Sequence, residues 1–308
     1  MKVGRRTLEV SNLDKVFFPD AGITKGDLLD YYRRAADFVL PHARDRLVAM
    51  HRFPDGIDGQ GFFHKDVPDH VPAWIRRERV EKADGHLHQL VIDDAATLVY
   101  IADQGCITPH VWLSRTDRID HPDRMVFDLD PPGDDFMAAF DVVRRTALRL
   151  RELLEALGLV AFVMTSGSRG LHLHVPLDRE TDFDGVRAFA IDAADLLVAR
   201  HPGRLTREQR KAKRGDRVYL DVMRNAYAQT TVAPYAVRAR EGAPLATPLS
   251  WDELGRSDLH PRRYGLRNLF RRMAQKDDPW MGMDRHARGL DGPARLLRRL
   301  REGTSSFR

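Results

Sequence analysis

The alternation of apolar and polar positions predicts a chain that mixes helices with strands. Apolar residues recur at helical spacing in three long segments, which are residues 24–40, 137–157 and 183–199. Short β-branched or alternating stretches, typical of strands, occur at 46–52, 160–164, 171–175 and 217–222. Thr24 is placed to cap the first helix, and we expect Pro41 to end it.

One further strand-like segment carries two carboxylates. In the apolar run from Met125 to Pro132, Asp128 and Asp130 are separated by a single residue. Alternate side chains of a strand point to the same face, so both carboxylates are predicted on one face. Carboxylates this close repel each other unless a proton or a cation compensates, and a divalent metal is the obvious cation. The alternative is a solvated strand end or turn.

A third carboxylate, Asp221, lies on the predicted strand 217–222. Three acidic side chains can hold two hard cations, with substrate phosphates completing the coordination. Two-metal sites of this kind stabilise the attacking and leaving oxygens of a phosphoryl displacement. The sequence therefore predicts a centre for phosphoryl transfer.

Several polar residues are candidates for binding phosphate. Ser166, Arg169 and His172 belong to a glycine-rich turn and the strand after it, where they can donate hydrogen bonds to an anion. The alternative is an ordinary hairpin with His172 and His174 on its exposed face. Elsewhere, a fixed guanidinium of Arg224 or Arg238 could clamp a triphosphate with two hydrogen bonds. The basic run 207–214 is more simply a solvated face.

Two adjacent aromatic residues suggest contact with bases. Phe62 and Phe63 end a glycine-rich loop and are followed by Lys65. Exposed aromatic rings beside basic side chains are what base stacking needs. Burial of one or both rings in the core is the alternative.

Length and composition narrow the class of protein. A chain of 308 residues with 43% hydrophobic content can bury a substantial core, and without internal repeats or a low-complexity linker we expect a single domain with two lobes over 1–308. A net charge of +5 favours a polyanionic partner. The single cysteine, Cys106, excludes an internal disulfide, and no apolar stretch is long enough for a signal peptide or membrane span. We predict a cytoplasmic protein with no membrane partner.

Four motifs, taken in their order and spacing, closely resemble the polymerase domain of bacterial LigD-type DNA repair ligases. They are residues 127–131, 166–172, 220–222 and 230–238, and the resemblance runs from about residue 8 to about 280, followed by a basic helical tail over about 281–308. That family belongs to the archaeo-eukaryotic primase superfamily and acts in non-homologous end joining. The resemblance implies an α+β primase-polymerase fold with mixed or antiparallel sheets flanked by helices. It also implies a template-directed nucleotidyltransferase, a DNA or RNA polymerase, that fills gaps and extends ends at double-strand breaks.

The resemblance implies a role for individual residues as well. Asp128, Asp130 and Asp221 match catalytic residues that bind two divalent ions, Mn²⁺ or Mg²⁺. Residues matching the contacts to the incoming NTP or dNTP are Ser166, Arg169, His172 and Arg238, with Arg52 and His110 as further candidates. Asn12, Lys15 and Lys25 match the pocket for the 5′-phosphate of a broken DNA end. Phe62 and Phe63 match the aromatic pair that stacks on the template.

The extent of the chain suggests how it works with other proteins. It starts at its own Met1 and ends near residue 308 without a ligase or nuclease module. We therefore expect a free-standing, nucleoid-associated polymerase that relies on Ku and on a separate ATP-dependent DNA ligase. Two other functions stay open. One is a non-catalytic module that binds or bridges DNA ends through Lys15, Lys25 and the loop of Phe62 and Phe63. The other is a primase that starts strands without a primer.

Overall fold

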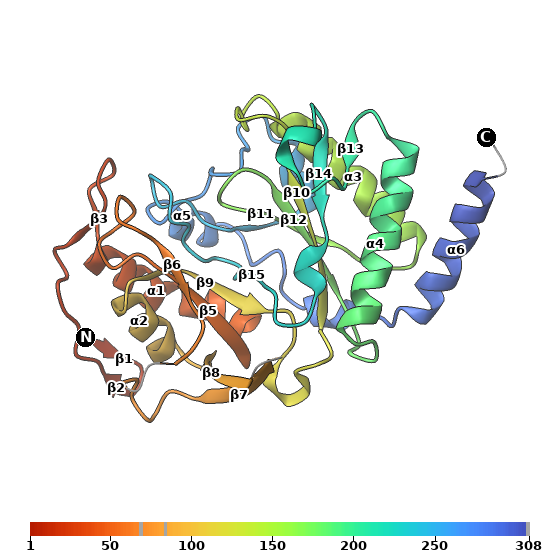
Figure 1. Cartoon of the computed structure of the whole chain (residues 1–308). Helices are drawn as coiled ribbons and strands as arrows, with labels where there is room; N and C mark the ends of the chain where they lie inside the picture. The colour runs from red at the N-terminus through yellow and green to blue at the C-terminus, as the bar shows by residue number, and fades with distance from the viewer. Residues whose placement is uncertain (68–69, 83–84, 306–308) are drawn as a thin grey trace. The chain divides into compact units, whose positions relative to one another are not determined.

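The computed structural model of the chain describes residues 1–67, 70–82 and 85–305, so the last three residues of the predicted tail lie outside it (Figure 1). The chain forms two compact units. Unit 1 consists of Met1–Asp117, Thr230–Thr247 and Arg262–Asp278. Unit 2 consists of Arg118–Gln229, Pro248–Pro261 and Pro279–Arg308. Within the described residues, none of the helices has both the length and the apolar character that a bilayer crossing requires.

Unit 1 is built on an antiparallel sheet in the order β15-β9-β5-β8-β7, with β6 paired to β5. Its strands are β5 (Arg46–Arg52), β6 (Phe62–His64), β7 (Arg77–Lys82), β8 (Gly85–Ile92), β9 (Cys106–Trp112) and β15 (Thr230–Val232). Two small ribbons pair β1 (Lys2–Val3) with β2 (Arg6–Thr7) and β3 (Val16–Phe18) with β4 (Ile23–Thr24). The helices are α1 (Lys25–Ala43), α2 (Ala95–Asp103) and α5 (Leu269–Met273). Helices α1 and α2 pack against each other, and α2 packs on β9.

Helix α1 begins as predicted but ends later. The Thr24 hydroxyl accepts a hydrogen bond from the Asp27 backbone N–H (3.2 Å), and the Asp27 carboxylate accepts one from the Thr24 backbone N–H (2.9 Å). This reciprocal pair is a capping box. Pro41 lies inside the helix, so the prediction that it ends α1 was wrong. In the last turn a proline removes one hydrogen bond, and burial of Leu40 and Ala43 keeps the following residues helical.

Unit 2 is built on a mixed sheet in the order β13-β14-β10-β12-β11-β16, in which β13 and β14 are parallel and the other pairs antiparallel. Its strands are β10 (Arg124–Asp130), β11 (Phe162–Thr165), β12 (Leu171–Pro176), β13 (Leu205–Thr206), β14 (Val218–Asp221) and β16 (Pro248–Leu249). The helices are α3 (Phe140–Ala156), α4 (Phe183–Arg200) and α6 (Asp291–Ser305). Helices α3 and α4 pack against β10 and against each other, and α6 packs on α4 (Figure 1).

Short 3-10 helices complete the chain. They are η1 (Thr116–Arg118), η2 (Lys211–Lys213), η3 (Met223–Asn225), η4 (Trp251–Gly255) and η5 (Met283–His286). The chain thus combines helices with mixed and antiparallel sheets, which agrees with the predicted α+β fold class. The predicted hairpin is present as β11 and β12, and the predicted basic tail helix lies within α6.

Candidate active site and nucleic-acid interface

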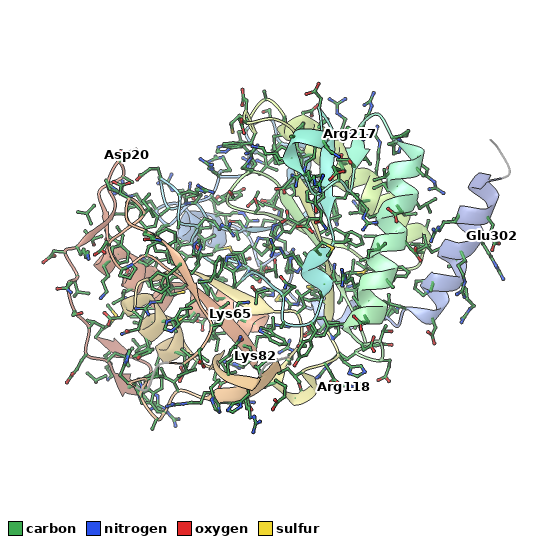
Figure 2. All side chains as sticks on the ribbon, in the orientation of Figure 1. Asp20, Lys65, Lys82, Arg118, Arg217 and Glu302 are labelled. Carbon is green, nitrogen blue, oxygen red and sulfur yellow. The ribbon has the colours of Figure 1, made fainter. Side chains whose placement is uncertain are left out.

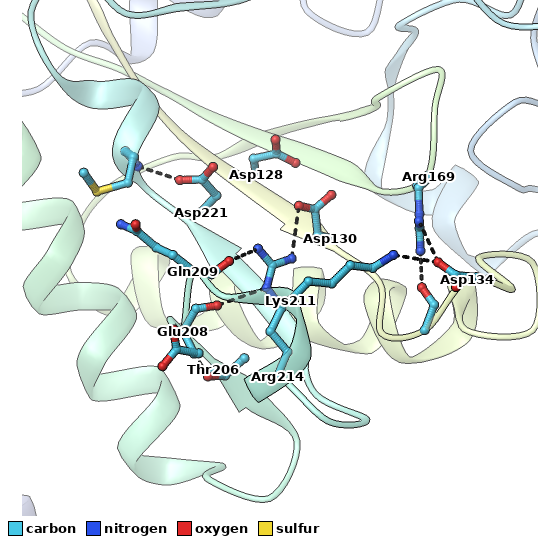
Figure 3. Close-up of polar contacts among 12 residues, drawn as sticks. Asp128, Asp130, Asp134, Arg169, Thr206, Glu208, Gln209, Lys211, Arg214 and Asp221 are labelled. Carbon is cyan, nitrogen blue, oxygen red and sulfur yellow. Dashed lines mark hydrogen bonds and ion pairs between the residues drawn. The ribbon is translucent and has the colours of Figure 1, made fainter.

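The three predicted aspartates meet on the sheet of unit 2. Asp128 of β10 lies directly opposite Asp221, the last residue of β14, and opposite His172 of β12 on its other side. Side chains opposed in this way share a face of the sheet and have Cβ atoms about 5 Å apart. Asp130 follows two residues along β10, on the same face. Figure 3 shows the three carboxylates close together at this end of the sheet.

The negative charges of these neighbouring carboxylates repel each other. The pKa of Asp130 is raised to about 6, first because burial penalises the charged form and next because Asp128 is close. His172 Nε2 lies 3.3 Å from Asp128 Oδ1, and Arg214 Nη1 lies 3.9 Å from Asp130 Oδ2. These contacts compensate the charge only in part, so the cluster favours a cation.

The same residues provide the donors that a hard divalent cation prefers, namely carboxylate oxygens. In the part of the chain that the structure describes, no three acidic, histidine or cysteine side chains converge on one ion position as they stand. Asp221 Oδ1, for example, accepts a hydrogen bond from the Met223 backbone N–H (2.8 Å). The residues therefore fit a metal by chemistry and by strand register, and the carboxylates would have to rotate to hold it.

A side chain that the sequence analysis missed keeps β10 and η3 together. Asn225 is fully buried, and its Nδ2 donates to the Val126 carbonyl (2.7 Å) while its Oδ1 accepts from the Val126 N–H (2.8 Å). Nδ2 also donates to the Val222 carbonyl (2.9 Å). The amide thus takes the place of a strand residue beside Val126, where β14 has already ended. No local pattern marks this asparagine in the sequence.

Arg214 was also missed, because it is one of many basic residues between 207 and 217. Its guanidinium lies 3.7 Å from the ring centroid of Tyr219, and it donates to the carbonyls of Glu208 (3.0 Å) and Gln209 (2.9 Å). Arg214 is therefore fixed beside Asp130 (Figure 3), and the interpretation of 207–214 as a merely solvated face was wrong for this residue.

The turn between β11 and β12 is organised from within. Ser166 Oγ accepts hydrogen bonds from the backbone N–H groups of Ser168 (3.2 Å), Arg169 (3.2 Å) and Gly170 (3.0 Å). Those amides are directed at Ser166, so what the turn can offer a phosphate is the Ser166 hydroxyl proton and the Arg169 side chain. A Cβ at Gly170 would lie 1.9 Å from the Leu129 carbonyl oxygen, and only glycine fits there.

The two histidines of the hairpin formed by β11 and β12 are both buried. His172 and His174 are 6% and 0% exposed, so the expectation that they lie on an exposed face was wrong. Of the two predicted arginines in this unit, Arg224 is exposed on η3. Arg169 donates to the Gly133 carbonyl and lies 3.6 Å from Asp134 Oδ1, which also accepts from Lys211 Nζ (2.6 Å).

In unit 1 a cavity of about 290 Å³ gathers the residues predicted to bind a 5′-phosphate. Lys25 is nearly buried, and its Nζ lies 2.7 Å from Asp103 Oδ1. Lys15 is paired with Asp55 (2.7 Å). The residues lining the cavity are Ser11, Asn12, Lys15, Phe17, Lys25, Arg52, Pro54, Asp103, Gln104 and Gly105.

Arg52 lines the same cavity, whereas the resemblance offered it as a contact to the triphosphate. Its Nε donates to the Gln104 carbonyl (2.7 Å), and its Nη1 lies 2.9 Å from His64 Nδ1. The guanidinium is thus oriented by the end of α2 and by β6. The structure brings it together with Lys15 and Lys25.

Phe62 and Phe63 lie on β6 with 43% and 53% of their surface exposed, so the alternative of core burial was wrong. Lys65 follows them and is exposed as well (Figure 2). His110 lies on β9, opposite Ala49 and Val232. Arg238 follows β15, and its backbone N–H donates to the Pro244 carbonyl (2.7 Å). These five candidate residues, with the cavity, belong to unit 1.

Comparison with known proteins identifies relatives along most of the chain. The chain is 34% identical over 307 residues to the multifunctional non-homologous end joining DNA repair protein LigD of Mycobacterium tuberculosis, an alignment covering 96% of this chain and 39% of that protein. The bifunctional LigD of Bacillus subtilis is 30% identical over 281 residues, covering 91% of this chain and 44% of that protein. The chain therefore spans less than half the length of these relatives.

A solved structure is similar over nearly its whole length. The polymerase domain of M. tuberculosis ligase D, in complex with DNA, superposes with a TM-score of 0.85 at 33% identity, covering 91% of this chain and 99% of that chain. Residues 24–280 also match the family described as the LigD primase-polymerase domain. The chain therefore belongs to the LigD primase-polymerase family.

Proposed function

We propose that the chain is a template-directed nucleotidyltransferase that adds nucleotides to a primer at a gap or break in DNA, within non-homologous end joining. The observation that carries this proposal is the register that sets Asp221 opposite Asp128, with Asp130 two residues further on. The LigD polymerase family is in general metal-dependent. We infer that these three carboxylates hold two ions, Mn²⁺ or Mg²⁺, which would activate the primer hydroxyl and neutralise charge on the transferred phosphate.

The other residues of unit 2 would bind and orient. His172, 3.3 Å from Asp128, fixes the orientation of that carboxylate. Ser166 and Arg169 present a hydroxyl and a guanidinium from the turn beside β10, and both are suited to nucleotide phosphates. Arg224 extends from η3, three residues after Asp221. The predicted nucleotide contacts of Arg52, His110 and Arg238 stay predictions.

We further propose that the cavity of unit 1 binds the 5′-phosphate of a DNA end. Lys15, Lys25 and Arg52 supply three cations around a space of about 290 Å³, and Asn12 adds an amide. Lys25 is held by Asp103 and Arg52 by the Gln104 carbonyl, so contacts within the protein orient two of the cations. A pre-organised set of this kind suits a phosphate monoester, which carries nearly two negative charges.

Primer extension on a gapped duplex tests the proposal. The protein is incubated with a 5′-phosphorylated gap, Mn²⁺ and each ribo- or deoxyribonucleotide in turn, and we expect extension by the wild-type chain. Asp128→Asn should abolish extension but retain DNA binding. Asp141→Asn, at an exposed aspartate of α3 that is paired with Arg144 and Arg145, is the matched control and should extend at the wild-type rate.

The same assay separates the competing functions. A mobility shift without extension would indicate a non-catalytic end-binding module, and product from an unprimed single strand would indicate a primase. Wild-type extension by an Asp128→Asn, Asp221→Asn double variant would refute the metal assignment.

We propose Ku and an ATP-dependent DNA ligase as partners, and the cytoplasm and nucleoid as the location. The names of the relatives, which place them in non-homologous end joining, support this. Co-precipitation of each purified candidate with the chain, with and without a DNA end, would test the contacts.

A further inference from the structure

The two exposed aromatic residues of β6 each face a particular residue of β5. In the register of this pair, Phe63 lies opposite His51 and Phe62 lies opposite Arg52. The rings of His51 and Phe63 stack, with centroids 4.4 Å apart and planes inclined by 5°. The imidazole therefore covers one face of the Phe63 ring. Since Phe63 is 53% exposed, much of its remaining surface is open to solvent.

Two further rings fix this stack. The ring of His110, on β9, meets Phe63 nearly at right angles (centroids 5.2 Å apart, 82°). Phe53 packs against His51 with centroids 4.6 Å apart. Contacts on a face and on an edge leave the Phe63 ring little freedom to turn. An exposed phenylalanine without such contacts would lose its rotational freedom only when it binds a ligand, and this loss would cost conformational entropy.

The His51 imidazole stays uncharged at neutral pH. Its pKa is lowered to about 4, first by burial and next by the nearby guanidinium groups of Arg238 and Arg240. An uncharged imidazole gains little from a DNA phosphate. Its contribution beside Phe63 is therefore that of an aromatic surface.

We propose that His51 is a positioning residue, whose ring holds Phe63 flat so that the open face of Phe63 stacks on a template base. This inference rests on the proposed role of Phe63 at a DNA gap and adds the residue that prepares it. With a base in place, the base, Phe63 and His51 form three successive layers, and aromatic groups in offset layers stabilise one another beyond the area that they bury.

Fluorescence of 2-aminopurine tests the proposal, because this base analogue reports stacking directly. It is placed in the template strand of a 5′-phosphorylated gapped duplex, and the wild-type chain is compared with His51→Leu, His51→Phe and Phe63→Ala. We expect Phe63→Ala to abolish the protein-dependent change in fluorescence. His51→Leu, which keeps the bulk of the side chain but not its ring, should weaken duplex binding about two- to tenfold and reduce the fluorescence change. His51→Phe should restore both.

Three controls make the result specific. His86→Ala removes an exposed histidine of β8 in the same sheet and should change nothing. The preference for a 5′-phosphate over a 5′-hydroxyl should be unaffected by His51→Leu, whereas general damage to unit 1 would reduce it. In a Phe63→Ala background, His51→Leu should have no further effect on binding, since the ring that it positions is absent.

The possible outcomes are distinct. If Phe63→Ala changes the fluorescence but His51→Leu does not, or if His51→Phe is as defective as His51→Leu, the positioning role is overturned while the role of Phe63 stands. If the effects of His51→Leu and Phe63→Ala simply add, His51 acts elsewhere. If Phe63→Ala itself has no effect, the proposed stacking and this inference fail together.

Discussion

Replacing Asn225 by alanine tests whether one buried amide holds the aspartate strands in place. The side chain makes three hydrogen bonds, two to Val126 on β10 and one to the Val222 carbonyl. Val126 is two residues from Asp128, and Asn225 is four residues from Asp221. The amide therefore joins the segments that carry both carboxylates.

The expected loss follows from burial. Each hydrogen bond contributes about 1 kcal/mol net, and leaving a buried polar group without its partner adds about 1–3 kcal/mol. Asn225 and Val126 are both fully buried, so solvent reaches the gap poorly. Allowing for water in the space vacated, we expect the free energy of unfolding to fall by about 3–4 kcal/mol, at the upper end for a single substitution.

Urea unfolding followed by far-UV circular dichroism measures this change. Asn225→Asp is the sharper variant, because it keeps an oxygen for the Val126 N–H but turns an oxygen toward the carbonyls of Val126 and Val222. It should be at least as destabilising as alanine at pH 7. Asn268→Ala, which removes a partly exposed amide from a turn, is the matched control and should cost about 1 kcal/mol. A loss of less than about 1 kcal/mol for Asn225→Ala would show that β10 and η3 do not depend on this amide.

Three further outcomes are expected. Asp221→Asn should slow primer extension by about 100-fold or more, since even residues that only support a metal ligand cost 10- to 100-fold, and full activity in excess Mn²⁺ would contradict the assignment. Lys25→Gln should reduce the preference for a 5′-phosphorylated over a 5′-hydroxyl gap about tenfold in a binding titration at fixed salt, whereas an unchanged ratio would remove Lys25 from the phosphate site. The pKa of His51 is lowered from 6.5 to about 4 in the folded chain, so between these pH values the unfolded chain binds the proton and stability falls as the pH drops. His51→Phe should lessen this fall in a series of melting temperatures, and a parallel pH profile would argue against it.

Features set by a few neighbouring residues were predictable from the sequence. The Thr24 cap depends on a side chain three residues from its partner, and the common face of Asp128 and Asp130 depends only on the period of a strand. Gly158 follows α3 with a positive φ of 79°, as expected for the residue that ends a helix. Each of these is a local property of the backbone.

Features that depend on contacts between distant parts of the chain were not predictable from the pattern of residues in the sequence. Val126 and Asn225 are 99 positions apart, and no periodicity joins them. Pro41 remains helical because tertiary burial outweighs the lost hydrogen bond. Arg52 lines the Lys25 cavity because the end of α2 supplies the carbonyl that orients it, and this contact joins residues 52 positions apart.

The division into units has a consequence for the design of truncated proteins. The chain passes between the units at residues 117–118, 229–230, 247–248, 261–262 and 278–279. Truncation after Gln229 would remove β15 and α5 from unit 1, and the largely buried strand β9 would then become an unpaired edge strand of its sheet. Edge strands of this kind form hydrogen bonds with strands of other molecules. We expect a polypeptide shortened in this way to precipitate on expression, so the role of each unit is better studied by point substitutions in the whole chain.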